Sequence, residues 1–171
     1  LISQMFPKNS FHLQYQFKSG ERVDAAIKTD AGILPIDSKF PMENFQKMVK
    51  AKTEKENEDF RKELVRDVKK HIDAISKKYI LPDEGTMDFA LMYLPSESVF
   101  YELADMQDII EYARKGRVYI VSPNTLYAHL QTILLSFEGK KIEVRSRQVL
   151  RLLRALQIDY DKVQENMGVL G

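Results

Sequence analysis

The sequence predicts an α/β fold in which helices flank a mixed β-sheet, and three observations lead to this prediction. Residues 11–39 alternate apolar and polar side chains in short runs separated by turns, as antiparallel strands with one buried face do. Two continuous apolar runs, at 88–94 and 118–121, have the composition of strands buried on both faces. Amphipathic segments with helical spacing separate and follow these runs, which is the element order of an α/β domain.

Three strands and two turns are expected near the start of the chain. Before them, residues 1–6 have the pattern of a helix end that stops ahead of Pro7. The strands are expected at 11–17, 23–28 and 33–39, with a kink at Pro35, and the turns at 18–20 and 29–32.

A long, charge-rich helical region is expected over residues 42–80, where an apolar stripe from Phe45 to Tyr79 recurs at helical spacing. Residues 50–59 inside it are almost all charged or polar, which indicates a solvated helix or a joint between two helices. Further helices are expected at 95–103, at 106–115, after a cap at 122–125, and from Gly139 to about residue 166.

The composition is that of an ordinary globular domain. The chain has 171 residues, of which 44% are hydrophobic and 30% charged, enough for one domain with a real core. A net charge of +1 excludes a strongly basic nucleic-acid-binding protein but leaves room for a local basic face. The absence of cysteine excludes disulfides and thiolate metal sites. No run is long enough to span a membrane, and the start without methionine predicts that residues 1–171 are one domain cut from a longer protein.

The second and third expected strands form a hairpin that brings two carboxylates together. If the turn at 29–32 closes it, Lys28 faces Ile33, and the same register places Asp24 directly opposite Asp37 with Cβ atoms about 5 Å apart. Lys39 lies two residues beyond Asp37 and therefore points to the same face. The opposite face receives only apolar residues, and a slip of one residue would bury the charges, so patterning supports this register.

Two carboxylates this close repel each other unless a cation lies between them. Mg²⁺ or Mn²⁺ is the cofactor that such oxygen ligands favour, and it would activate a water and offset charge on a phosphate. Lys39 would position that water or stabilise the developing negative charge, so the pattern favours phosphodiester hydrolysis. The plainer alternative is a surface hairpin in which Lys39 forms an ordinary ion pair with Asp24 or Asp37.

Other polar residues are weaker candidates for the same site. Gln14 is expected opposite Asp24, and Gln16 follows on the same strand; both would support the carboxylates or face DNA, unless they are simply exposed. Glu97 starts a helix after a buried strand, where it either caps the helix or approaches the site. His71 is expected to be a packing or surface residue of the long helix rather than a ligand.

A basic segment near the C-terminus is the best candidate for contacts with a phosphate backbone. Arg147, Arg151 and Arg154 share one helical face, and Lys141 and Arg145 lie just before them. The alternative is a solvated basic helix face, and no aromatic residues interleave to support base stacking.

The hairpin carries a known signature. Asp24 followed by Asp37-Ser38-Lys39 resembles the PD-(D/E)xK motif of restriction-endonuclease-like nucleases, with Val23 in place of the usual proline. The region from about residue 11 to 165 also resembles the RmuC family of DNA recombination proteins. The segments that carry this second resemblance are Arg22-Val23-Asp24-Ala25-Ala26-Ile27, Ile36-Asp37-Ser38-Lys39, Lys77-Lys78-Tyr79, Tyr93-Leu94-Pro95-Ser96-Glu97 and Val121-Ser122-Pro123-Asn124-Thr125-Leu126.

The resemblance implies a restriction-endonuclease-like sheet and a metal-dependent DNA nuclease linked to recombination. Asp24 and Asp37 would be metal ligands, the backbone carbonyl of Ser38 a third ligand, and Lys39 the catalytic lysine. Many such nucleases add a glutamate from a preceding helix, and this chain supplies no candidate there. Family members usually carry an upstream coiled coil, often with a membrane anchor, which implies a cytoplasmic location and an anchor outside this segment.

Two other functions stay open at this level. One is a non-catalytic DNA-binding or scaffolding module built on a nuclease fold. The other is an interaction domain in which the helical region at 42–80 pairs with a partner. The expected partners are therefore DNA and, through the helices, a second copy of the chain, with no membrane contact by this segment.

Overall fold

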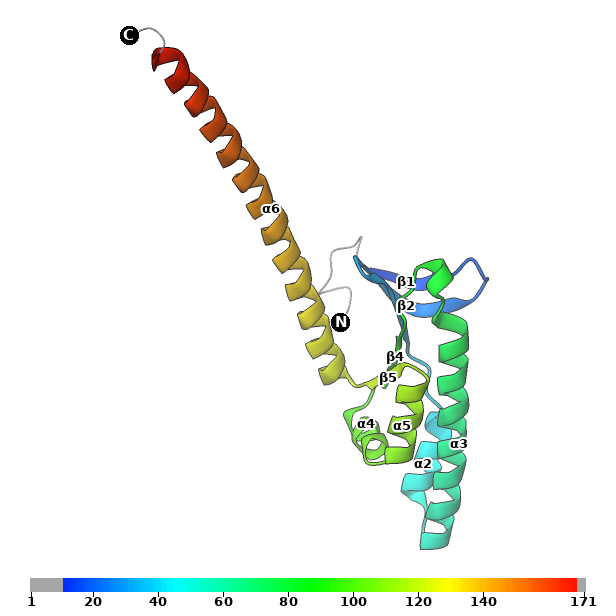
Figure 1. The fold of residues 1–171 in the computed structure, drawn as a ribbon. Helices are drawn as coiled ribbons and strands as arrows, with labels where there is room; N and C mark the ends of the chain where they lie inside the picture. Colours follow the sequence, from blue (N-terminus) through cyan, green and yellow to red (C-terminus); the bar gives the residue numbers. More distant parts are fainter. Residues whose placement is uncertain (1–10, 169–171) are drawn as a thin grey trace. The chain divides into compact units, whose positions relative to one another are not determined.

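The computed structural model describes residues 11–168, except for the side chains of 134, 136–144 and 156–168 (Figure 1). The expected helix end at residues 1–6 lies outside the described residues. The chain divides into two compact units, residues 1–128 and 129–171. The first unit contains the whole sheet, and the second consists of most of one long helix.

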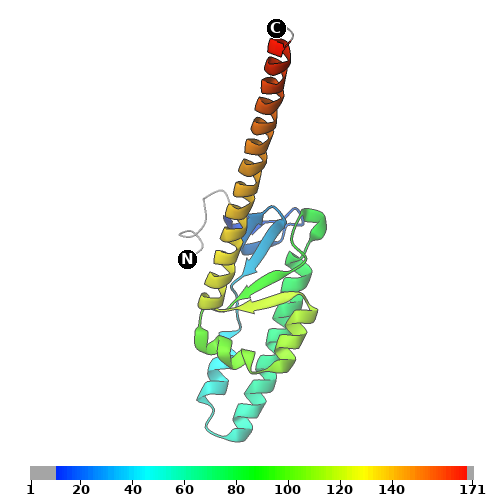
Figure 2. The same cartoon turned by 60° about the vertical axis from the view of Figure 1, so that its left-hand side comes forward.

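A five-stranded mixed sheet confirms the expected α/β fold. Its strands lie in sequence order, with the first three antiparallel and the last three parallel. Figure 2 shows the last strands side by side, in colours from light blue to yellow-green. The strands are β1 (Phe11–Gln16), β2 (Arg22–Thr29), β3 (Gly32–Asp37), β4 (Ala90–Tyr93) and β5 (Val118–Val121).

The register predicted for the β2–β3 hairpin is confirmed. Lys28 pairs with Ile33, and Ala25 pairs with Ile36. Ala25–Ile36 is the pair farthest from the turn. Asp24 and Asp37 occupy the next step of the same register, at the open end of the hairpin. The local alternation of apolar residues and the four-residue turn are enough to set this pairing.

The expectation that one hairpin face stays polar and open is wrong. Val23, Ala25, Ile27, Leu34 and Ile36 are buried as predicted, but Ala26 and Asp37 on the other face are buried too, at 0% and 2% exposure. The cause is a helix that packs on the second face, since Ala26 shares one apolar cluster with Ile72 and Ile75. Leu13, on the edge strand, is 64% exposed.

The charged region at 42–80 is two helices, so the second of the two alternatives, a joint between helices, is the one observed. Helix α2 (Met42–Lys50) and helix α3 (Glu54–Tyr79) lie side by side in Figure 1. Thr53 caps α3, because its side chain accepts a hydrogen bond from the backbone N–H of Glu56 at 3.2 Å. The stripe of α3 from Leu64 to Tyr79 is buried and forms part of the core, while Phe60 at its start is only partly buried.

The remaining helices mostly follow the expected order. They are the short 3₁₀ helix η1 (Pro82–Glu84), α4 (Glu97–Ala104), α5 (Gln107–Lys115) and α6 (Pro123–Gly168). The predicted break at Gly139 is wrong, since α6 runs through it without interruption (Figure 1). A mid-helix glycine costs only about 1 kcal/mol relative to alanine, too little to end a helix of this length. Within the described part of the chain, no helix is long and apolar enough to cross a membrane.

Candidate active site

The carboxyl ends of the parallel strands meet at one edge of the sheet. Asp37 ends β3, while the segments that follow β4 and β5 lead into helices α4 and α6. Open α/β sheets bind ligands at this edge, because strands deliver side chains there and loops leave space. The predicted residues Asp37, Ser38 and Lys39 therefore lie where such folds place their chemistry.

Asp24 lies at the start of β2 and is held by hydrogen bonds from three groups. Its Oδ2 accepts from the backbone N–H of Ser38 at 2.9 Å and from the Ser38 hydroxyl at 2.7 Å. Its Oδ1 accepts from the side-chain amide of Gln14 at 3.2 Å, the contact predicted from the strand pairing. Burial raises the pKa of Asp24, but the bonds from Ser38 and Gln14 and the charge of Lys39 outweigh it and hold that pKa below 3.8.

Asp37 is almost completely buried, and its neighbour is a histidine. Its Oδ2 lies 3.0 Å from Nε2 of His71 on α3. Both atoms are shielded from solvent, and neither has hydrogen-bond geometry with any described group, so this contact is an ion pair by distance only. A buried carboxylate oxygen without an aligned donor is costly, which makes Oδ2 of Asp37 the least satisfied acceptor of the site.

His71 is a candidate site residue that the sequence does not place near Asp37. The sequence predicts a packing or surface side chain of the long helix, and in the structure His71 is 21% exposed with its Nε2 atom beside Asp37. A signal was present, because His71 lies three residues after Val68 and four before Ile75, on the buried stripe of α3. A polar residue on a buried stripe requires a partner, and the strand end supplies it.

Lys39 is exposed and shares a hollow with His71. The hollow has a volume of about 360 Å³ and lies between the loop after β3 and helix α3. Lys39, Lys70 and His71 give it a basic character, and Asp67 is its single acidic residue; Phe40, Pro41 and Ala74 complete the lining. The surroundings of Lys39 therefore favour an anionic group near the two carboxylates.

Tyr79 closes the other side of the carboxylate pair. Its hydroxyl donates to the backbone carbonyl of Arg22 at 3.1 Å. Burial, followed by the charges of Asp37, Glu21 and Asp24, raises the pKa of Tyr79 from 10.0 to about 12. Tyr79 therefore stays a neutral donor at physiological pH and adds no negative charge to the site.

The donor set fits a hard cation that is only partly held by protein. Among the described residues, no group of three or more His, Cys, Asp or Glu side chains is close enough to form a complete metal cage. Two carboxylates from adjacent strands, one with an unsatisfied oxygen, match Mg²⁺, which commonly uses one or two carboxylates together with water and phosphate oxygens. The Ser38 N–H and hydroxyl both donate to Asp24, and its backbone carbonyl is the further ligand that the nuclease signature implies.

Comparison with known proteins then decides the family, because the RmuC family model matches residues 1–171. The chain belongs to the RmuC family. It is 33% identical over 135 residues to the DNA recombination protein RmuC homolog of Xylella fastidiosa strain Temecula1, covering 75% of this chain and 29% of that protein. It is 28% identical over 142 residues to the DNA recombination protein RmuC of Escherichia coli K12, covering 80% of this chain and 29% of that protein. No solved structure matches the chain.

The RmuC-family chain brings only some of the other candidates to the carboxylates. Gln14 reaches Asp24 with a positive φ of 50°, a rare backbone state for a residue other than glycine. Gln16 is exposed and pairs with Arg22, away from the carboxylates in the strand register. Glu97 is held elsewhere, because its Oε1 accepts from the backbone N–H of Asn124 at 2.8 Å and so caps α6.

The basic candidates of this RmuC-family chain lie in the second compact unit. Arg145, Arg147, Arg151 and Arg154 are exposed on α6, and the side chain of Lys141 lies outside the described residues. Exposure of four arginines on one helix suits contacts with phosphates, and it equally suits a solvated face. The sequence prediction for these residues therefore stays a prediction.

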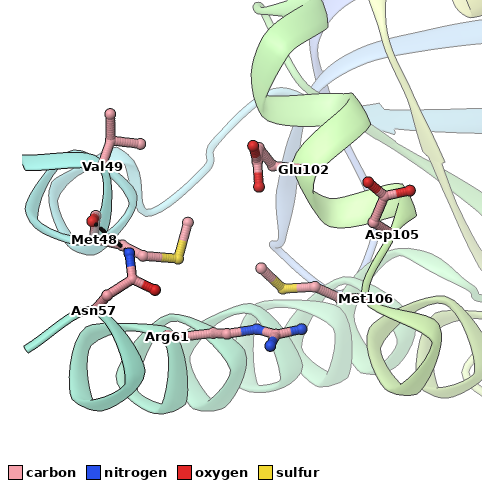
Figure 3. Close-up of a pocket in the computed structure, with 7 residues that line it drawn as sticks. All are labelled: Met48, Val49, Asn57, Arg61, Glu102, Asp105 and Met106. Carbon is pink, nitrogen blue, oxygen red and sulfur yellow. Dashed lines mark hydrogen bonds between the residues drawn. The ribbon is translucent and has the colours of Figure 1, made fainter. Parts of the chain in front are cut away.

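A second hollow of about 350 Å³ lies apart from the carboxylates, at the other end of α3. Arg61 in its lining precedes His71 by ten residues, which is about 15 Å along a helix. Figure 3 shows Met48 and Met106 pointing toward each other across it, with Arg61 on one side and Glu102 on the other. Neither methionine nor any other lining residue belongs to the predicted nuclease signature.

Proposed function

We propose that this RmuC-family chain carries the catalytic residues of a metal-dependent DNA nuclease that hydrolyses phosphodiester bonds. The observation that carries the proposal is the placement of Asp24 and Asp37 at one step of the β2–β3 register, with Lys39 two residues further. The relatives are named DNA recombination proteins, which supports DNA as the substrate. The chain spans about 29% of the length of those relatives, so the activity of the whole protein is part of this proposal.

Each residue has a proposed role. Asp24, Asp37 and the carbonyl of Ser38 would hold Mg²⁺ or Mn²⁺, which when bound lowers the pKa of a water and offsets charge on a phosphate oxygen. Lys39, exposed and close enough to lower the pKa of Asp24, would stabilise the negative charge that develops on the phosphate. Ser38 and Gln14 fix the Asp24 carboxylate in one orientation through their hydrogen bonds.

His71 would act as a positioning residue for Asp37. Its Nε2 atom lies 3.0 Å from the unsatisfied oxygen of Asp37. A ligand whose carboxylate is held by a second residue keeps its orientation and its affinity for metal. This role links helix α3 to the strand that carries the proposed ligands.

Cleavage of DNA with and without Mg²⁺ or Mn²⁺ tests the proposal. The longer protein and this chain should both be assayed, because the chain spans only about 29% of the length of its relatives. Asp37→Asn and Lys39→Ala should each lower the rate at least about a hundredfold, the usual scale for loss of such a group. Asp59→Asn and Lys62→Ala, exposed on α3, are matched controls and should cleave normally. Undiminished cleavage by both site variants would refute the assigned roles.

A non-catalytic DNA-binding module is the second candidate. It is favoured by the lack of a three-residue metal cluster among described side chains and by the engagement of both Asp24 oxygens. It predicts salt-sensitive DNA binding without cleavage under any metal. Arg151→Ala should reduce the slope of log affinity against log salt by about 1 if that side chain contacts one phosphate.

A further inference from the structure

The second compact unit is a helical segment with large exposed apolar side chains. A contiguous apolar patch on a helix marks a binding surface, whereas single exposed apolar residues are ordinary. Val149, Leu150, Leu152 and Leu153 are neighbours within a turn and a half of α6. The exposed fractions are 65% for Leu135, 54% for Val149, 53% for Leu150, 66% for Leu152 and 55% for Leu153.

One series of apolar residues in this segment recurs at heptad spacing, alongside apolar residues at other positions such as Phe137, Val144 and Ile158. If Val149 is position d and Leu153 the next position a, every d position along the segment is apolar. The d positions are Leu135, Ile142, Val149, Leu156 and Val163. The a positions change in size along the helix, from Thr132, Gly139 and Ser146 to Leu153, Tyr160 and Met167.

This change in size favours an antiparallel partner of the same sequence. In a parallel pair each a position meets itself, so Gly139 and Ser146 would leave two poorly filled layers. In an antiparallel pair each a position meets a d position of the other copy. With Leu153 level with Val149 of the second copy, Ser146 is level with Leu156 and Gly139 with Val163, so every small residue meets a large one.

The e and g positions, which flank the a and d core positions, favour the same register. In an antiparallel pair g positions lie next to g positions, and e positions next to e positions. Arg145 is then beside Asp159 of the second copy, twice by symmetry, while Leu152 and Leu150 each meet their own counterparts at the centre. A shift by one heptad would set Leu152 against Asp159 or Arg145, which penalises other registers. A parallel pair would instead bring Glu138 next to Glu143.

We propose that residues 135–167 of α6 pair with the same segment of a second copy as an antiparallel two-helix coiled coil centred near Arg151. Arg147, Arg151 and Arg154 occupy outer positions b and f of this repeat, so pairing leaves that basic face uncovered. The inference is independent of the proposed nuclease activity, because none of the carboxylate-site residues takes part.

Charge reversal in the 171-residue chain tests the pairing by sedimentation equilibrium. Arg145→Glu places like charges beside Asp159 at two sites and should raise the dimer dissociation constant about tenfold. Asp159→Arg should do the same, and the double variant Arg145→Glu/Asp159→Arg should return close to the starting value. Arg151→Glu, an equal change at an outer position, should leave the constant unchanged. Failure of the double variant to restore association would overturn the proposal.

Cysteine cross-linking tests whether the two paired helices run parallel or antiparallel. No native cysteine has to be replaced first, because the chain contains none. A mixture of Ser146→Cys and Leu156→Cys should form a disulfide between the two variants, while neither variant alone should cross-link. Self-linking of Ser146→Cys would show a parallel pair and overturn the proposal. A chain that stays monomeric at all concentrations, or that associates only with a different protein, would overturn it as well.

Discussion

His71 of helix α3 lies with its Nε2 atom 3.0 Å from Oδ2 of Asp37, the buried carboxylate that ends strand β3. This contact joins the helical layer to the strand end that carries the proposed nuclease signature. It leaves the Oδ2 atom of that carboxylate beside the imidazole ring without an aligned hydrogen bond. The arrangement couples the packing of α3 to the strand that carries the proposed ligands.

The first prediction concerns this pair. His71→Ala leaves a buried carboxylate without its neighbour and should lower the free energy of unfolding by about 3 kcal/mol in metal-free solution. Asp37→Asn removes the charge, so in that background the same histidine change should cost at least about 1 kcal/mol less. Urea denaturation measures both values, with the exposed Lys70→Ala as control. Strict additivity of the two changes would show that the residues do not interact.

The second prediction concerns pH and the Ser38–Asp24 hydrogen bond. The folded pKa of Asp24 lies below 3.8, so its contribution to stability is present above that pH and is lost as pH falls through the folded pKa. Ser38→Ala removes the 2.7 Å bond and should cost about 1 kcal/mol near neutral pH, with the difference shrinking in acid. In an Asp24→Asn background the serine change should cost the same at every pH. Persistence of the pH effect there would assign it to another group.

The third prediction separates metal binding from catalysis. A cation bound by the folded state alone raises the melting temperature with its concentration. Mg²⁺ or Mn²⁺ should therefore stabilise the chain, and Asp37→Asn should remove that effect. Lys39→Ala should keep it, because the lysine is assigned to the phosphate and not to the metal. Equal stabilisation of the Asp37→Asn variant would place the cation elsewhere.

The fourth prediction concerns the hairpin turn. Gly32 has φ +132°, and a Cβ there would lie 2.9 Å from the carbonyl oxygen of Gly85. Gly20 has φ +90° but nothing within 4 Å of that position, so it is a matched control for strain alone. Gly20→Ala should cost about 1 kcal/mol and Gly32→Ala about 3 kcal/mol or more, since the second change also displaces backbone. Thermal unfolding of both variants gives the difference, and equal costs would exclude the clash with Gly85.

The order of elements and the hairpin register follow from the sequence because both depend on neighbours in the chain. Alternating apolar residues in β2 and β3 leave one acceptable register, and the turn between them closes it. The same local logic put Gln14 next to Asp24. It failed at Gly139, because one unfavourable residue is outweighed by the many favourable positions of α6.

The sequence by itself thus determined the β2–β3 register, whose next step holds Asp24 and Asp37, because that register needs only strand periodicity and a short turn. The tertiary structure alone decided that Asp37 is buried and that His71 faces it. Those two facts depend on how α3 packs across the sheet, a contact between segments more than thirty residues apart. Packing of that kind is set by the combined shape of both surfaces, and no local pattern in either segment contains it.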